Sequence, residues 1–259
     1  MDDDGRLRVL DLFSGIGGFS LGLERAGMTT VGFCEIDPFC RAVLKKHWPE
    51  VPCHDDITTR EFVAGEADIV CGGFPCQGIS SANHRGEGLA DARSGLWSEI
   101  ARAIRTVRPR YGIFENVAAL TFRGLDEVLW DIARCGYDAE WSTLPASACG
   151  APHSRDRIFI VAYPAGERRE EDEIFRRVAL KTAGQKQAMR LRGWPGKREH
   201  SAALPNRIRW VPDSELCRVA DGVPDELDRY RALGNSIVPQ CVELIGRAIM
   251  EVEQCTTTT

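Results

Sequence analysis

Short runs of β-branched, aromatic and aliphatic residues alternate with helix-like segments along the first 163 residues. Apolar runs of this length, closed by Gly, Pro, Asp or Asn, are typical of strands. The alternation predicts an α/β fold with a mostly parallel sheet covered by helices on both faces. We expect the strands at 8–13, 30–35, 67–73, 111–116, 139–145 and 157–163.

Three segments carry helix signals. Asp37 and Pro38 are residue types that suit an N-cap and the first turn of a helix. Apolar residues recur at helical spacing along 125–133 and again along 240–253. The second stripe predicts a carboxyl-terminal helix that packs back on the first domain.

The periodic pattern lapses between residues 164 and 222. Residues 164–210 hold 12 Lys and Arg against 6 Asp and Glu, although the whole chain has a net charge of −5. A basic segment in an acidic body suits a surface that binds a polyanion, and a solvated helix face is the alternative. We divide the chain into a catalytic and cofactor-binding domain (1–163), a small separate region (164–222) and a returning carboxyl-terminal segment (223–259).

The cysteines and the amino terminus narrow the class of protein. The 10 cysteines include no C-x-x-C pair, which argues against zinc-ribbon and thioredoxin-like sites, and most are expected to be reduced and buried. The first residues are acidic, and no stretch approaches the ~18 apolar residues of a membrane span. We expect a cytoplasmic monomer with neither a metal nor a membrane partner.

The segment 11–23 predicts a nucleotide-like cofactor site. Gly15, Gly17 and Gly18 follow a strand and let the backbone turn tightly against a ligand, but Ser20 stands where a dinucleotide fingerprint needs its third glycine. Glu35, at the end of the next strand, suits the two ribose hydroxyls of an adenosine moiety. A plain glycine turn with a surface glutamate is the alternative.

Further ligand-binding positions are expected where other parallel strands end. Asp56-Ile57 and Phe74-Pro75 should border the same crevice, with Asp56 near an adenine amino group and Ile57 and Phe13 against the ring faces. For Asp56, a simple turn role is the alternative.

Cys76 follows the apolar strand 67–73 and should emerge in a loop at this crevice. Its neighbours Pro75, Gln77 and Gly78 are unlike those of a core cysteine. A thiolate there could act as a nucleophile, whereas most cysteines are small buried hydrophobes.

Three more side chains could act on the same ligand as Cys76. Glu115, followed by Asn116, ends the strand 111–116 and brings a carboxyl group to this edge. Arg155 and Arg157 are two residues apart, so both can reach one anionic or carbonyl-bearing group. An ordinary turn and a solvated strand end are the alternatives.

The chain resembles the DNA (cytosine-5) methyltransferases in six segments that occur in the order of that family: DLFSGIGGF, EID, GGFPCQGIS, ENV, RDR and RALGNSIVP. The resemblance covers most of the chain and is closest to compact phage and prophage enzymes. It implies the Rossmann-like fold of S-adenosylmethionine-dependent methyltransferases. It also implies double-stranded DNA as substrate and a role in DNA methylation and restriction-modification, with 164–222 as a small target-recognition region.

The resemblance implies a mechanism. The Cys76 thiolate adds to carbon 6 of a flipped cytosine, while Glu115 gives a proton or hydrogen bond to ring nitrogen 3. Carbon 5 then takes the methyl group of S-adenosylmethionine, loses its proton and releases Cys76. Arg155 and Arg157 resemble the clamp on the flipped nucleotide.

The resemblance also assigns binding residues. Residues matching the cofactor pocket are Phe13, Gly15, Gly17, Glu35, Ile36, Asp56, Ile57, Pro75, Leu96, Asn235 and Ser236. Positions 78–95 resemble the catalytic loop that closes over DNA. Residues expected to contact DNA are Ser80, Arg85, Arg93, Arg190, Arg192, Arg198, Arg207 and Arg209.

The chain departs from the family at several points. His153 holds the usual place of Gln in the arginine motif, Ile36 stands where an aromatic is common, and the motif that normally precedes GNS is not recognisable. Three rival functions remain open: a nicotinamide-dependent oxidoreductase, a catalytically silent DNA-binding relative and an RNA cytosine methyltransferase. Binding of S-adenosylhomocysteine or NAD separates the first, and parallel assays on duplex DNA and tRNA separate the last.

Overall fold

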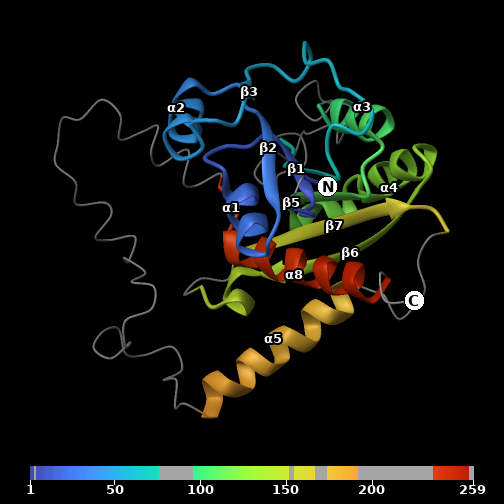
Figure 1. The fold of residues 1–259 in the computed structure, drawn as a ribbon. Helices are drawn as coiled ribbons and strands as arrows, with labels where there is room; N and C mark the ends of the chain where they lie inside the picture. Colours follow the sequence, from blue (N-terminus) through green and yellow to red (C-terminus); the bar gives the residue numbers. More distant parts are fainter. Residues whose placement is uncertain (3, 76–95, 152–154, 167–173, 192–235, 257–259) are drawn as a thin grey trace.

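The computed structural model describes residues 1–2, 4–75, 96–151, 155–166, 174–191 and 236–256, and within 184–191 it describes the backbone alone. Its centre is a seven-stranded sheet with the strand order β3-β2-β1-β4-β5-β7-β6 (Figure 1). Strand β7 runs antiparallel to both of its neighbours, and all other pairs are parallel. The expected mostly parallel α/β sheet is confirmed.

The six strands expected from the apolar runs are all present. They are β1 Arg8–Leu12, β2 Thr29–Cys34, β4 Ile69–Gly73, β5 Tyr111–Val117, β6 Tyr137–Pro145 and β7 Asp156–Pro164. Strand β3, Cys53–His54, was not expected, because two residues are too few to form an alternating pattern.

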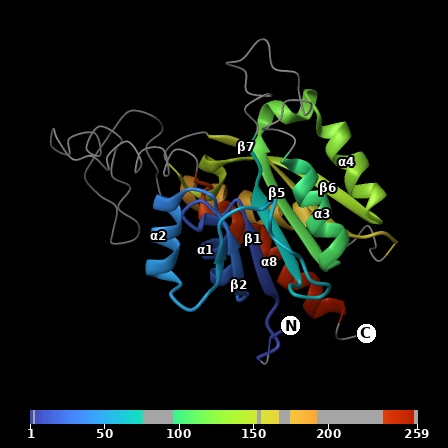
Figure 2. The same ribbon diagram turned by 90° about the horizontal axis from the view of Figure 1, so that it is seen from above.

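Helices cover both faces of the sheet and enclose two hydrophobic cores. Helices α1 (Gly18–Arg25), α5 (Ile174–Leu191) and α8 (Pro239–Thr256) lie on one face (Figure 1). Helices α3 (Trp97–Val107) and α4 (Leu125–Arg134) lie side by side on the other (Figure 2). Helix α2 (Pro38–His47) contacts β3, and the short 3-10 helices η2 (Ala118–Phe122) and η3 (Ala146–Cys149) follow β5 and β6.

The three helix signals of the sequence are confirmed. Asp37 caps α2, and its Oδ1 accepts hydrogen bonds from the backbone N–H groups of Phe39 at 2.8 Å and Cys40 at 3.2 Å. The apolar stripe of α8 is buried, and in α4 Leu125, Val128 and Ile132 are buried, whereas Ala133 is exposed. Helix α8 packs on α1 so closely that a Cβ on Gly22 would lie 2.5 Å from the carbonyl oxygen of Pro239.

Helix α5 lies within the region 164–222, where the sequence showed only weak periodicity. Its first turns nevertheless belong to the packing of the sheet, because Ile174 and Val178 are fully buried against the α1 and α8 side. The Glu140 carboxylate on β6 accepts the backbone N–H groups of Ile174 at 2.9 Å and Phe175 at 3.0 Å, which satisfies the start of the helix. The division into 1–163, 164–222 and 223–259 stays a prediction.

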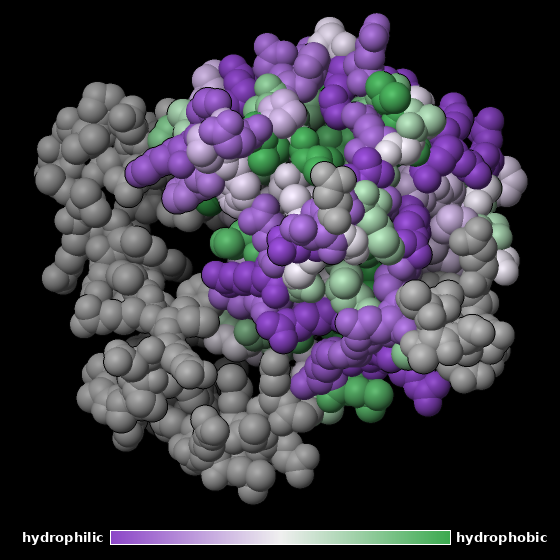
Figure 3. Space-filling model, in the orientation of Figure 1, coloured by the Kyte–Doolittle hydropathy of each residue, from purple (hydrophilic) through white to green (hydrophobic). Residues whose placement is uncertain are grey.

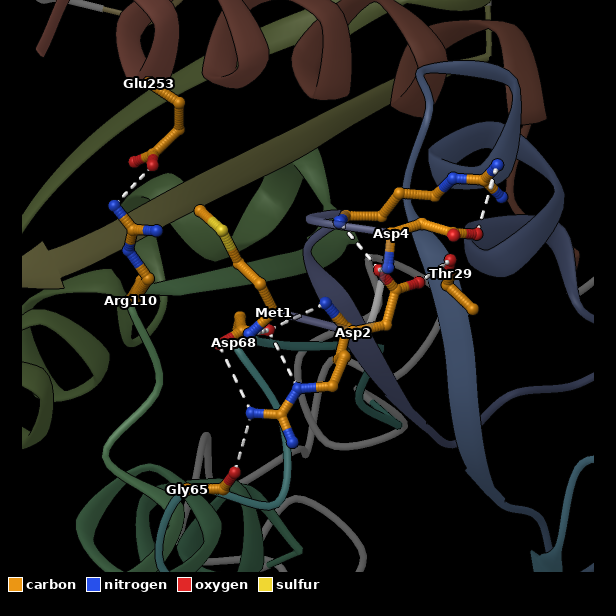
Figure 4. Close-up of polar contacts among 10 residues, drawn as sticks. Met1, Asp2, Asp4, Thr29, Gly65, Asp68, Arg110 and Glu253 are labelled. Atoms are coloured by element: carbon orange, nitrogen blue, oxygen red, sulfur yellow. Dashed lines mark hydrogen bonds and ion pairs between the residues drawn. The ribbon is translucent and has the colours of Figure 1, made fainter. Parts of the chain in front are cut away.

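Polar contacts tie the amino-terminal edge of the sheet together (Figure 4). Asp68 accepts the amino terminus at 2.8 Å and both the backbone N–H and the Nε of Arg8, at 2.9 and 3.0 Å. An ion pair between Arg110 and Glu253 joins the start of β5 to the end of α8. These contacts fix the edge of the sheet that lies opposite the site described below.

The surface is mostly hydrophilic in the view of Figure 3, where hydrophobic residues form small separate patches. Within the described ranges no helix is both long and apolar enough to cross a membrane. In the same part of the chain, no three His, Cys, Asp or Glu side chains are grouped as a metal site would require.

Candidate active site

The strand directions bring the described members of the expected site, among them Glu35, Glu115 and Arg157, to one edge of the sheet. Strands β1, β2, β3, β4 and β5 end at this edge, whereas β7, being antiparallel, begins there. Gly73 at the end of β4 pairs with Glu115 on β5, and Val117 pairs with Arg157 on β7. The end of β4, two residues before Pro75, therefore lies next to Glu115 and the arginine motif.

The turn between β1 and α1 has the backbone that its glycines predict. Gly15 and Gly17 have φ angles of +54° and +86°, in the left-handed region that favours glycine. A Cβ on Gly17 would lie 2.6 Å from the Trp48 ring, whereas a Cβ on Gly15 would meet nothing within 4 Å. The turn thus presents open space beside Gly15. Phe13 also has a positive φ, +53°, a strained conformation that is common at functional sites.

Glu35 lies against this turn. Its Oε2 accepts the backbone N–H of Gly15 at 2.7 Å, and its Oε1 accepts that of Asp37 at 2.8 Å. The next residue, Ile36, is 70% exposed. Glu35 therefore contacts the glycine turn directly, as the sequence predicted.

The other expected pocket residues have mixed environments. Asp56 accepts the backbone N–H and the hydroxyl of Thr58 at 2.9 and 2.8 Å, which is a local turn. Ile57 is buried in the core that includes α3, and Leu96 packs against it at the start of that helix. In the carboxyl-terminal segment, Ser236 and Ile237 pack against the glycine turn. A Cβ on Gly18 would lie 2.5 Å from Ile237 and 3.1 Å from the Ser236 hydroxyl.

Glu115 is the central titratable group of the site. Its Oε1 lies 2.9 Å from Nε of Arg157, and its Oε2 is so close to Gly73 that a Cβ there would approach it to 2.9 Å. Burial raises the pKa of Glu115 to about 7, although the charges of Arg157 and Arg155 oppose the shift. A carboxyl group with this pKa can both hold and release a proton near neutrality.

Arg155 is poised beside the same carboxyl group. Its side chain is half-buried, and its Nε has no hydrogen-bond partner among the described residues. Burial and the neighbouring charge of Arg157 lower its pKa. A buried arginine Nε without a partner is rare in proteins, which makes Arg155 a candidate for a further polar contact.

Asn116 anchors the segment that leads to Cys76. Its amide Nδ2 donates to the carbonyl oxygen of Phe74 at 3.2 Å, and the side chain is buried. The Phe74 ring packs on Trp97 at 4.9 Å between centroids, and Trp97 packs edge-on against Phe114 at 5.4 Å. These contacts fix the backbone and the ring of Phe74, two residues before Cys76.

Three residues of the site were not expected from the sequence. Asn116 was noted only as the neighbour of Glu115, although strand alternation directs the two side chains to opposite sides. Gly73 could have been predicted from the sequence, since a glycine at the end of an apolar strand leaves room for a side chain of the neighbouring strand, here Glu115. Asp11 is a fully buried acid in the apolar strand β1; its Oδ2 accepts the Ser20 hydroxyl at 2.8 Å, and burial raises its pKa to about 7.

Several expected site residues lie outside the described part of the chain. They are Cys76, Ser80, Arg85, Arg93, His153, Arg192, Arg198, Arg207, Arg209 and Asn235. For Arg190, on α5, only the backbone is described. Their roles stay predictions.

Comparison with known proteins supports one family. The family model for C-5 cytosine-specific DNA methylase matches residues 7–204. Type II methyltransferase M2.BsuMI of Bacillus subtilis (strain 168) is 36% identical over 165 residues, which cover 60% of this chain and 42% of that protein. Type II methyltransferase M.HhaI of Haemophilus parahaemolyticus is 32% identical over 161 residues, covering 61% and 49%. The chain spans less than half the length of these two relatives.

Solved structures agree with the fold. A protein from an E. coli prophage, described as a DNA modification methyltransferase, aligns over 96% of this chain and 99% of its own, with a TM-score of 0.62 and 20% identity. The S. pombe Dnmt2 methyltransferase aligns over 97% and 99%, with a TM-score of 0.59 and 18% identity. Identity at this level shows the fold alone. The fold and the match to the family model over residues 7–204 together show that the chain belongs to the C-5 cytosine-specific DNA methylases.

Proposed function

We propose that this protein transfers a methyl group from S-adenosylmethionine to carbon 5 of cytosine in a specific sequence of double-stranded DNA. The reaction runs through a covalent Cys76–cytosine intermediate after the base has flipped out of the helix. The observation that carries the proposal is Glu115, whose pKa of about 7 and contact with Arg157 suit a proton donor to the cytosine ring. Family membership and the Type II methyltransferase relatives support it.

The residues at the glycine turn fit S-adenosylmethionine. The open space beside the left-handed Gly15 admits a ligand close to the backbone, and Glu35 lies next to it. When bound, S-adenosylmethionine supplies an activated methyl group on a sulfonium. The residues that would hold it are Phe13, Gly15, Gly17, Glu35, Ile36, Asp56, Ile57, Pro75, Leu96, Asn235 and Ser236.

The side chains of the other half of the site act on the base. The Cys76 thiolate forms a bond to carbon 6, and Glu115 gives its proton to ring nitrogen 3, which neutralises the negative charge that the addition would otherwise leave on the ring. Carbon 5 becomes nucleophilic and is methylated. A base then removes the proton from carbon 5, and the electron pair of that C–H bond expels the Cys76 thiolate. The proton on ring nitrogen 3 returns to Glu115, which restores the aromatic ring and the free enzyme.

The arginines orient this chemistry. Arg157 donates to Glu115 and moderates the effect of burial on its pKa, so the carboxyl group titrates near neutrality and not far above it. Arg155, with its Nε free of partners in the described part of the chain, clamps the flipped nucleotide. Asn116 positions the stem of the Cys76 loop through the Phe74 carbonyl group.

DNA recognition is assigned to the segments around this site. The loop 78–95 closes over the backbone with Ser80, Arg85 and Arg93. The region 164–222 reads the sequence, because arginine is the side chain best suited to guanine in the major groove. Residues proposed for this readout are Arg190, Arg192, Arg198, Arg207 and Arg209.

Replacing Cys76 with alanine tests the proposal. Cys76→Ala should abolish methyl transfer to duplex DNA and leave binding of S-adenosylhomocysteine nearly intact, because the thiol attacks the base and does not hold the cofactor. The unmodified protein should form a covalent adduct at Cys76 with duplex DNA containing 5-fluorocytosine, since fluorine cannot leave as a proton does.

A second cysteine provides the matched control for this experiment. Cys255 is exposed near the end of α8, so Cys255→Ala should keep both the activity and the adduct. Methylation by Cys76→Ala, an adduct at another residue, or activity on tRNA and not on duplex DNA would contradict the proposal.

A further inference from the structure

Two cysteines from distant parts of the chain meet beside the candidate site. Cys149 ends η3, between β6 and β7, and Cys241 lies in the first turn of α8. The Sγ atoms are 2.7 Å apart, with the Cys241 thiol as the hydrogen-bond donor. A disulfide bond has an S–S distance of about 2.05 Å, so a small approach of the two sulfurs suffices for a covalent bond.

The two thiols are unlike in exposure and in acidity. Cys241 is 2% exposed, whereas Cys149 is only partly buried. The hydrogen bond from Cys241 lowers the pKa of Cys149, and the same contact raises the pKa of Cys241. Cys149 is therefore the thiol that a reagent in solution reaches first, and Cys241 lies buried behind it.

Cys34, Cys53 and Cys71 differ from Cys149 in their pKa values, and of these three only Cys53 is, like Cys149, partly exposed. Burial raises the pKa of Cys34 to about 12 and also raises the pKa values of Cys53 and Cys71. A buried thiol with a raised pKa is inert toward disulfide exchange. The combination of a close partner, partial exposure and a lowered pKa thus distinguishes Cys149 from these three.

The pair lies between the segments that border the site. The backbone N–H of Ala146, at the start of η3, donates to the carbonyl oxygen of Arg155 at 3.2 Å, so η3 is linked directly to the arginine motif. Cys241 follows the segment in which Ile237 packs on Gly18 of the glycine turn. The charge of Glu115 also raises the pKa of Cys241, which indicates that the pair is within electrostatic range of the site.

We propose that Cys149 and Cys241 form a dithiol modification site for small disulfide oxidants. The Cys149 thiolate attacks one sulfur of oxidised glutathione, forms a mixed disulfide and releases one glutathione thiolate. Cys241 then loses its proton, attacks the Cys149 sulfur and releases the second glutathione. Two protein thiols are oxidised to one disulfide, and one molecule of oxidised glutathione is reduced to two thiols. The bond joins η3 covalently to α8, and the inference does not depend on the proposed activity.

The full-length protein treated with oxidised glutathione tests the proposal. Mass spectrometry of the intact protein should show the loss of two hydrogens, and digestion without reductant should yield a peptide pair joined through Cys149 and Cys241. Reduction with dithiothreitol should restore both thiols. Because this experiment uses the protein without any substitution, its result does not depend on how a variant folds.

Three variants separate the roles of the two thiols. Cys241→Ser should accumulate a glutathione mixed disulfide on Cys149, because the thiol that resolves it is gone. Cys149→Ser should leave Cys241 unmodified, since that residue is buried. Cys255→Ser, at an exposed position of the same helix, should form the Cys149–Cys241 bond as before. Absence of the linked peptides in the protein with its own sequence would overturn the proposal. Equal amounts of the glutathione mixed disulfide on Cys149 in that protein and in Cys241→Ser would also overturn it.

Discussion

Two carboxyl groups at opposite edges of the sheet each meet the Nε of an arginine at nearly the same distance. Glu115, at the site, lies 2.9 Å from Arg157, and Asp68, at the amino-terminal edge, lies 3.0 Å from Arg8. Their pKa values nevertheless move in opposite directions. Burial raises that of Glu115 to about 7, whereas for Asp68 the hydrogen bonds from Arg8 and the amino terminus outweigh burial and lower the pKa.

The difference teaches that an arginine neighbour alone does not fix the protonation of a buried acid. Asp68 accepts the backbone N–H of Arg8 and the amino terminus besides Nε, so its negative charge is compensated by several donors. The second oxygen of Glu115 faces the bare backbone of Gly73. Several hydrogen-bond donors stabilise the charged form of Asp68 and lower its pKa. Glu115 has fewer donors, so burial favours its protonated form, which can donate the proton.

The largest expected effect is on the reaction itself. Glu115→Gln should slow methyl transfer by roughly 10²–10⁴-fold, the usual contribution of general acid-base catalysis, because an amide cannot pass a proton to ring nitrogen 3. Single-turnover rates on duplex DNA measure this, and DNA affinity should change little. Asp68→Asn is the matched change at the other edge and should leave the rate within about twofold. Equal losses in both variants would mean that Glu115 acts through stability alone.

A smaller effect should appear in the pH profile. With a folded-state pKa of about 7, the protonated fraction of Glu115 falls as pH rises through 7. If the protonated form is the donor, the single-turnover rate should fall about tenfold per pH unit above this value. The descending limb should be missing in Glu115→Gln. If the single-turnover rate of Glu115→Gln fell with the same midpoint, the titration would belong to another group.

The smallest effects concern stability, and they should have opposite signs at two acids. Burial raises the pKa of Asp11 to about 7, so the stability that its proton provides is complete below the ordinary pKa and is lost as pH rises through 7. Asp11→Asn should therefore stabilise the fold more at pH 8.5 than at pH 5, by on the order of 2 kcal/mol.

Asp68 provides the contrasting case. Its lowered pKa gives stability that is present above the ordinary pKa and lost as pH falls through the folded-state value. Asp68→Asn should cost about 1–3 kcal/mol at pH 7, the usual loss when a charged hydrogen-bonding group is removed, and less at pH 3. Denaturant unfolding across pH measures both variants. If the effects of Asp11→Asn and Asp68→Asn on the free energy of unfolding changed with pH in the same way, the contrast between Asp11 and Asp68 would be refuted.

The sequence predicted the parts of the fold that repeat a pattern. The strands, the cap of α2 and the stripe of α8 all depend on local periodicity or on a single residue type, and each is present. The two-residue β3 has no period to detect. Helix α5 is polar along much of its length, and its attachment through Ile174, Val178 and Glu140 involves β6, more than 30 residues earlier in the chain.

The site divides in the same way. Strand ends and glycines predicted that Glu35, Glu115 and the glycine turn would lie at the same edge of the sheet, because the carboxyl ends of parallel strands share an edge. The contact between Asn116 and Phe74 joins two strands 42 residues apart and leaves no local signature. The pairing of Cys149 with Cys241 is equally silent in sequence, since their spacing matches no known motif.

The antiparallel pairing of β7 with both of its neighbours fixes the position of Arg157. Arg157 is fixed by register against Val117 on one side and Leu144 on the other, so its position is set by two ladders of backbone hydrogen bonds. Arg155 lies before the strand, and its carbonyl oxygen accepts the backbone N–H of Ala146 in η3 at 3.2 Å. The two arginines of the motif are therefore held differently: the two neighbouring strands fix Arg157, and η3 holds the backbone of Arg155.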